Sequence, residues 1–97
     1  MNKIKEHSNY WTDLIKEKPI TIKEHLYGTD FDYIEYSYCL HNKTIKLCFY
    51  EDFFYIVVDN KTEEVLYYEN NIKAIFEEEI KTTGLTIKKL GNEEDLT

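Results

Sequence analysis

The sequence contains no arginine, and all twelve of its basic residues are lysine. Arginine is the residue that most often makes paired hydrogen bonds to phosphate groups and to guanine. The formal net charge is −7, and a negative protein surface repels nucleic acid. We therefore expect no direct binding of nucleic acid by this chain.

Long apolar runs are also missing. The longest run, Phe53–Val58, is far shorter than the ~20 residues that a membrane-spanning helix needs. The apolar residues that follow Met1 are spaced rather than contiguous, which is unlike a signal peptide. These absences predict a protein that does not associate with membranes and works in the cytoplasm.

Residues with catalytic or metal-binding chemistry are few and scattered. Cys39 and Cys48 match neither a zinc-ligand nor a redox spacing, so we expect two thiols without a disulfide. His7, His25 and His41 are widely spaced, and the three glycines are isolated, so no glycine-rich phosphate loop is present. The sequence predicts no catalytic residue, no metal and no cofactor, and hence a protein that is not an enzyme.

The chain does contain enough apolar residues for one core. It has 97 residues, of which 42% are hydrophobic, and this size and composition fit a single folded domain. We expect this domain to cover residues 1–90 and the polar, acidic residues 91–97 to form a flexible tail.

Two stretches have apolar residues at helical spacing. The first predicts a helix over residues 3–17, which Pro19 would end. The second predicts a helix that begins after Asn70 or Asn71 and ends near Gly84, a residue that commonly terminates helices.

Between these helices, apolar and polar residues alternate as in strands. Residues 20–26 predict a half-buried strand, and residues 33–41 predict a second strand that a turn at Asn42-Lys43 joins to a third. That turn would pair Leu40 with Ile45.

The next run, Phe53–Val58, is apolar on both faces and predicts a central strand that is covered on both sides. Glu51-Asp52 before it is either a tight turn or a bulge in one long strand. Residues 65–68 predict a return strand, and residues 85–89 leave open a short closing strand. The predicted fold is α+β: an antiparallel sheet of four to five strands, flanked by an N-terminal and a C-terminal helix.

The middle of the chain is aromatic and acidic. Residues 31–68 hold 11 of the 15 aromatic residues, and residues 24–79 carry 13 carboxylates against 4 lysines. Two helices with narrow apolar stripes cover only one face of such a sheet well, although the sequence does not decide which. The other face would expose aromatic side chains rimmed by carboxylates, a surface that usually marks a protein interface.

We expect this surface to bind a protein partner with a basic surface, through tyrosines as anchors and carboxylates that steer the approach. The residues expected to make contact are Tyr33, Glu35, Tyr50, Glu51, Asp52 and Glu63.

In size, acidity and order of elements over residues 3–82, the chain resembles small phage or mobile-element proteins of bacteria. It is similar to some anti-CRISPR proteins, in which an αβββα order carries an acidic surface that blocks a DNA-binding groove. The resemblance implies a small acidic inhibitor that binds a basic, nucleic-acid-handling protein of the host by mimicking DNA. Toxin-immunity proteins share this element order, so the alternative is an immunity-type or self-dimerising module without enzymatic activity.

Overall fold

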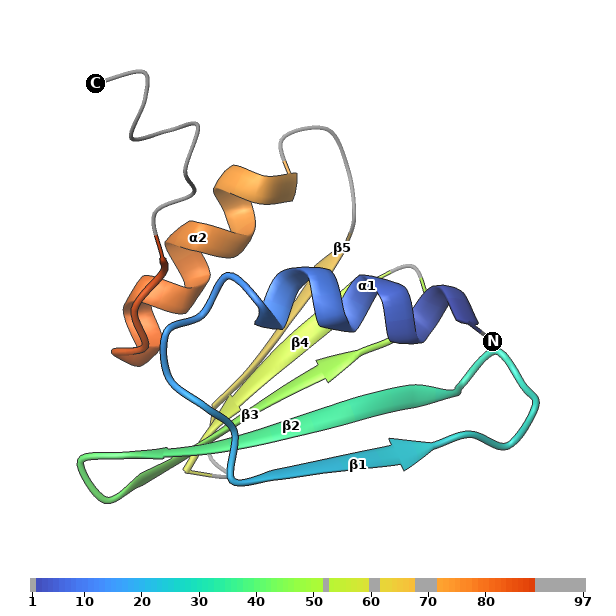
Figure 1. Ribbon diagram of the computed structural model, residues 1–97, viewed down its shortest axis with the longest axis horizontal. Coiled ribbons are helices and arrows are strands. Elements are labelled where there is room, and N and C mark those ends of the chain that lie inside the picture. The colour runs from blue at the N-terminus through green and yellow to red at the C-terminus, as the bar shows by residue number, and fades with distance from the viewer. Residues whose placement is uncertain (1, 52, 60–61, 68–71, 89–97) are drawn as a thin grey trace.

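The computed structural model of the protein describes residues 2–51, 53–59, 62–67 and 72–88 (Figure 1). The elements in chain order are α1 (Asn2–Thr12), β1 (Thr21–His25), β2 (Tyr33–Leu40), β3 (Lys43–Phe49), β4 (Phe53–Val58), β5 (Thr62–Tyr67) and α2 (Ile72–Thr83). The strands form one antiparallel sheet in the order β1-β2-β3-β4-β5. The predicted α+β class is confirmed, with five strands between two helices in the described part of the chain. The predicted tail, residues 91–97, lies outside the described residues.

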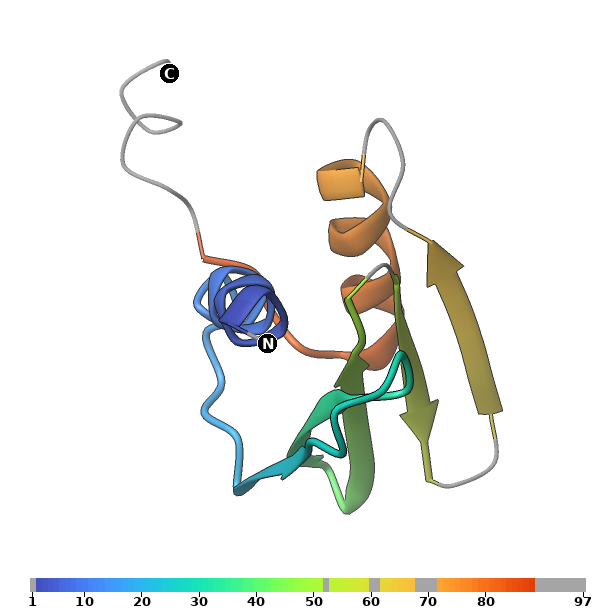
Figure 2. The same cartoon turned by 90° about the vertical axis from the view of Figure 1, so that its right-hand side faces the viewer.

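Both helices lie on the same face of the sheet (Figure 2), which we call the inner face. Phe76 of α2 is fully buried, with its ring centroid 4.8 Å from that of Trp11 in α1 and 5.3 Å from that of Phe54 in β4. This one side chain therefore joins both helices to the sheet. The strand residues buried on the inner face are Ile34, Tyr36, Tyr38, Ile45, Leu47, Phe49, Phe54 and Ile56.

The first helix ends at Thr12, so the predicted helix over residues 3–17 is too long. The amide of Ile15 donates to the carbonyl of Thr12 at 3.1 Å, a three-residue turn that leaves α-helical geometry. Ile15 then forms an isolated antiparallel bridge with Ile87. The described part of residues 85–89 thus pairs with the α1–β1 connector in a single bridge, and not with the sheet as a closing strand.

Gly84 ends the second helix, as its position in the sequence predicts. Its φ of 96° is left-handed, and its amide donates to the carbonyl of Lys81 at 3.1 Å. A Cβ at this position would lie 3.1 Å from Cδ2 of Leu40, so the helix end packs closely against the sheet.

The β2–β3 hairpin turns one residue earlier than predicted. His41 and Asn42 both have positive φ, 53° and 67°, as in the two-residue turns whose twist matches that of the strands. Leu40 therefore pairs with Lys43 rather than with Ile45, a shift of two residues that keeps the apolar residues on the same face.

This register also separates the two cysteines along the hairpin. Cys39 lies opposite Thr44, and Cys48 lies opposite Glu35. Neither cysteine forms a disulfide within the described residues, as the sequence predicts.

The connection between β3 and β4 is a turn, which decides between the two alternatives for Glu51-Asp52. The amide of Tyr50 donates to the carbonyl of Phe53 at 2.8 Å and closes the hairpin. Asp52 itself lies outside the described residues.

Two predictions of burial are wrong, and the placement of the helices explains both. β4 is central in the sheet, but its residues Phe53, Tyr55 and Val57 are only half-buried because neither helix covers that face. The strand predicted over residues 20–26 was expected to be half-buried, yet Ile22 in β1 and Ile20 just before it are exposed. α1 packs against β2 and β3, so the edge strand β1 extends beyond it.

Candidate protein-binding surface

The face of the sheet opposite to the helices, which we call the outer face, carries a line of aromatic rings at one end. The centroids of His25 and Tyr33 are 4.2 Å apart, those of Tyr33 and Tyr50 are 4.9 Å apart, and those of Tyr50 and Phe53 are 4.5 Å apart. The three interplanar angles are 12°, 22° and 7°, so the rings are stacked. We call these four side chains the aromatic row.

The stacking decides which chemical surface the row presents. Tyr33 and Tyr50 each have a neighbouring ring on both faces, so they offer their edges and hydroxyl groups to the outside. Single-stranded nucleic acids bind by stacking bases on exposed ring faces. The row is therefore unlike a base-stacking platform and better suited to a protein surface, where tyrosine is a common anchor.

The phenol groups of Tyr33 and Tyr55 on this face stay protonated at neutral pH. Burial is the main cause that raises the pKa of Tyr33, with smaller contributions from Cys48, Tyr50 and Glu35. Burial is likewise the main cause that raises the pKa of Tyr55, followed by Cys48 and Tyr50. The outer face thus keeps neutral hydroxyl groups that both donate and accept hydrogen bonds.

Glu35 lies beside the aromatic row and is engaged within the protein. Its Oε1 is 3.3 Å from Nε2 of His25, its Oε2 is 3.9 Å from Nζ of Lys46, and Ser37 Oγ donates to Oε2 at 3.5 Å. Only 14% of the side chain is exposed. Glu35 therefore helps to organise the outer face and has less charge available for a partner than the sequence suggests.

The other predicted contact residues are placed as follows. Tyr33 and Tyr50 are neighbours in the aromatic row, and Glu51 is exposed in the turn that follows Tyr50. The backbone of Glu63 pairs with Val57 in the β4–β5 ladder. Asp52 lies outside the described residues. The structure thus brings Tyr33, Tyr50 and Glu35 together on one face, with Glu51 at its end.

The loop between β1 and β2, residues 26–32, projects beyond the aromatic row and was missed as a candidate. Tyr27 and Phe31 in this loop are 69% and 76% exposed. The available signal was the presence of turn-forming residues, Gly28, Asp30 and Asp32, within seven residues.

Asp32 holds this loop in shape. Its carboxylate accepts hydrogen bonds from the backbone amides of Tyr27 at 2.7 Å, Gly28 at 3.2 Å and Thr29 at 3.2 Å. These hydrogen bonds lower the pKa of Asp32 below its ordinary value, and the bond from the Tyr27 amide has the largest effect. The Asp32 carboxylate is therefore engaged in hydrogen bonds within the loop, whereas the side chain of Asp30 is exposed.

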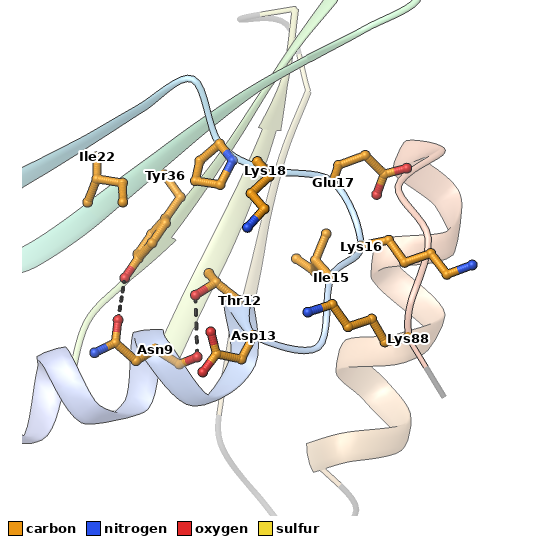
Figure 3. A pocket seen from close by; sticks show the side chains of 11 residues that line it. Asn9, Thr12, Asp13, Ile15, Lys16, Glu17, Lys18, Ile22, Tyr36 and Lys88 are labelled. Atoms are coloured by element: carbon orange, nitrogen blue, oxygen red, sulfur yellow. Dashed lines mark hydrogen bonds between the residues drawn. The ribbon is translucent and has the colours of Figure 1, made fainter. Parts of the chain in front are cut away.

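A hollow of about 220 Å³ lies on the other side of the molecule, between the end of α1, the α1–β1 connector and β2 (Figure 3). At its side, the hydroxyl of Tyr36 donates to Asn9 Oδ1 at 3.1 Å and lies 3.0 Å from Ser8 Oγ. The carboxylate of Glu17 is held by the amide and hydroxyl of Thr86 at 2.9 and 2.8 Å. The hydrogen-bonding groups of Tyr36 and Glu17 thus serve the fold.

Among the described residues, no three His, Cys, Asp or Glu side chains gather in a way that could hold a metal ion. Within the same part of the chain, no helix has the length and apolar character that crossing a membrane requires. Comparison with protein families, with curated proteins and with solved structures finds no match for this chain. The functional argument therefore comes from the geometry described above.

Proposed function

We propose that this protein is a non-enzymatic inhibitor of the anti-CRISPR or anti-defence type. It acts in the cytoplasm of a bacterial host and binds a basic, nucleic-acid-handling protein through the outer face of its sheet. The observation that carries the proposal is the aromatic row, which lies on the face that neither α1 nor α2 covers.

Stacked aromatic side chains are suited to anchor a protein contact. Tyr33, Tyr50 and Phe53 are already half-buried and ordered by one another, so binding costs little further side-chain entropy. A partner that covers the row would bury the ring edges and find hydroxyl groups for hydrogen bonds.

Charge favours a basic partner. The net charge is −7, and the exposed carboxylates of Asp30 and Glu51 lie in the β1–β2 loop and the β3–β4 turn, at the same end of the sheet as the row. A groove that binds nucleic-acid phosphates attracts such a surface by the same long-range field. Mimicry of DNA is the form of inhibition that this charge supports.

A second candidate function is self-association, as in an immunity-type or self-dimerising module. The observation that favours it is the edge strand β1, where Ile22 is exposed and is preceded by the exposed Ile20. Exposed edge strands with apolar side chains can pair with the same strand of a second copy. The net charge of −7 opposes this association between identical chains.

The test is capture from a bacterial lysate on the immobilised protein, with washes at low and then high salt. We expect a basic, nucleic-acid-handling protein that is retained at low salt and released by high salt. Glu51→Lys should reduce the amount retained, because it reverses a charge beside the aromatic row. Glu78→Lys is the matched control, since Glu78 is exposed on α2 at the helical side of the molecule.

Two results would contradict the proposal. Equal retention by the Glu51→Lys and Glu78→Lys variants would mean that the outer face does not steer the partner. Capture of nothing, together with a salt-stable dimer by light scattering, would favour the self-association candidate instead.

A further inference from the structure

The most exposed aromatic side chains of the described chain lie in the β1–β2 loop, not in the aromatic row. Phe31 is 76% exposed and Tyr27 is 69% exposed, whereas Tyr33, Tyr50 and Phe53 are half-buried. A phenylalanine in this position adds little to the core, and its exposure is unfavourable in water. Leu26, the first residue of the same loop, is also exposed.

The loop that carries these rings is held by hydrogen bonds of its own. Asp32 accepts from three backbone amides, and the amide of Phe31 donates to Oγ1 of Thr29 at 3.1 Å. Gly28 has a φ of 77°, a left-handed conformation that favours glycine. A loop fixed before binding loses little conformational entropy on binding, which is the property of a preorganised anchor.

The loop is also continuous with the candidate surface. His25 precedes it and Tyr33 follows it, and these two residues are the first stacked pair of the aromatic row. A partner that covers the row at this end would also lie next to the loop that carries the exposed Tyr27 and Phe31.

The charge of the loop indicates what it fits. Residues 26–32 contain no lysine, and the exposed Asp30 stands directly beside Phe31. An aromatic ring flanked by a carboxylate is complementary to an apolar pocket with lysine or arginine at its border. A second copy of this chain is a poorer occupant, because it brings a net charge of −7.

We propose that the β1–β2 loop is the anchor of the protein interface, and that Phe31 and Tyr27 enter an apolar pocket bordered by basic residues on the partner. This inference rests on the proposed function and names the part of the chain that makes the tightest contact.

The test places a photoreactive residue, p-benzoylphenylalanine, at one position at a time and irradiates each protein in a bacterial lysate. The positions are Phe31 in the loop, Glu51 at the end of the aromatic row, and Tyr10, which is 52% exposed on α1 and serves as the control. Cross-linked peptides are identified by mass spectrometry. Excess wild-type protein and excess Phe31→Ala variant are added as competitors.

The inference predicts a cross-link from position 31 to one partner protein, at a peptide that contains apolar residues next to lysine or arginine. Wild-type competitor should abolish it, and the Phe31→Ala competitor should require at least about tenfold more protein to do so. Position 10 should give no such cross-link.

The other outcomes overturn the inference in distinguishable ways. A specific cross-link from position 51 without one from position 31 would leave the proposed function standing and remove the anchor role of the loop. Cross-links only between two copies of this chain would favour self-association. Specific cross-links from neither position would contradict both the inference and the proposed function.

A second measurement uses the partner identified by the cross-link. It compares binding affinities to distinguish the contribution of the exposed rings from that of the loop conformation. Asp32→Asn keeps Phe31 and Tyr27 but removes a charged acceptor of the loop amides, so binding should weaken several-fold. Tyr10→Ala should change affinity by less than twofold. An unchanged affinity of the Asp32→Asn variant, with faster hydrogen exchange of the loop amides, would show that preorganisation does not contribute.

Discussion

The two faces of the sheet use the same kind of side chain for different purposes. On the inner face, Phe49 and Phe54 are fully buried beneath α1 and α2. On the outer face, Tyr50 and Phe53 stack on each other at 4.5 Å and stay half-buried. Neighbouring residues of one strand thus differ in burial because only one face has helices over it. An aromatic-rich sequence therefore does not by itself distinguish core from binding surface.

The largest expected effect comes from the adjacent pair Phe54 and Phe53. Phe54→Ala should lower the free energy of unfolding by about 3–5 kcal/mol, because it opens a cavity beside Phe76. Phe53→Ala should cost only about 1 kcal/mol, since it mainly removes a stacked neighbour of Tyr50. Urea denaturation of both variants measures the difference. Equal losses would mean that the outer face is as much a core as the inner face.

A pair of glycines gives the next largest effect. Gly84→Ala should cost about 2 kcal/mol, because φ is 96° and the new Cβ would lie 3.1 Å from Leu40. Gly28→Ala should cost about 1 kcal/mol, because φ is 77° but no atom lies within 4 Å of the new Cβ. Thermal unfolding of the two variants tests the order. A larger loss at Gly28 would contradict the idea that the loop is the less tightly packed of the two regions.

Removing the hydroxyl groups of two inner-face tyrosines should change the free energy of unfolding less. We expect a loss at one position and no change or a gain at the other. Tyr36→Phe should cost about 1 kcal/mol, because its hydroxyl bonds to Asn9 and lies near Ser8. Tyr38→Phe should be neutral or stabilising, because the buried hydroxyl of Tyr38 has no hydrogen-bond partner among the described residues. Chemical denaturation of both variants is the measurement, and a clear loss for Tyr38→Phe would show that its hydroxyl is paired in solution.

The smallest effect is a pH dependence in the β1–β2 loop. The pKa of Asp32 is lowered in the folded protein, so its stabilising contribution is complete above the ordinary aspartate value of 3.8. That contribution is lost as the pH falls through the lowered, folded-state value. We expect loop amides to exchange faster with solvent as the pH falls through this window, after correction for intrinsic exchange rates. The Asp32→Asn variant should not show this change, and an equal change in both proteins would assign it to another group.

The order of elements could be predicted from the sequence because it depends on local periodicity. Apolar residues at helical spacing and alternating residues identify both helices and the strands. The end of α1 could not be predicted, since the pairing of Ile15 with Ile87 is a contact between residues far apart in the chain. The β2–β3 register was missed because His41 adopts a left-handed φ that sequence pattern alone does not indicate.

The candidate surface was predicted in part. Tyr33 and Tyr50 were named from composition and alternation, and they are in contact in the aromatic row. The contacts of Glu35 with His25 and Lys46 and the ordering of the loop by Asp32 were not foreseen, because both depend on three-dimensional neighbours. The exposure of Tyr27 and Phe31 depends on the conformation of the β1–β2 loop, which strand periodicity does not specify.

The most direct test of the account is hydrogen–deuterium exchange of this protein, alone and with the partner captured from lysate. The account predicts slower exchange on binding in residues 26–33 and around Tyr50 and Phe53, with α1 and α2 unchanged. Protection confined to the helices, or to residues 13–19 beside the hollow, would contradict the claim that the uncovered face of the sheet is the binding surface.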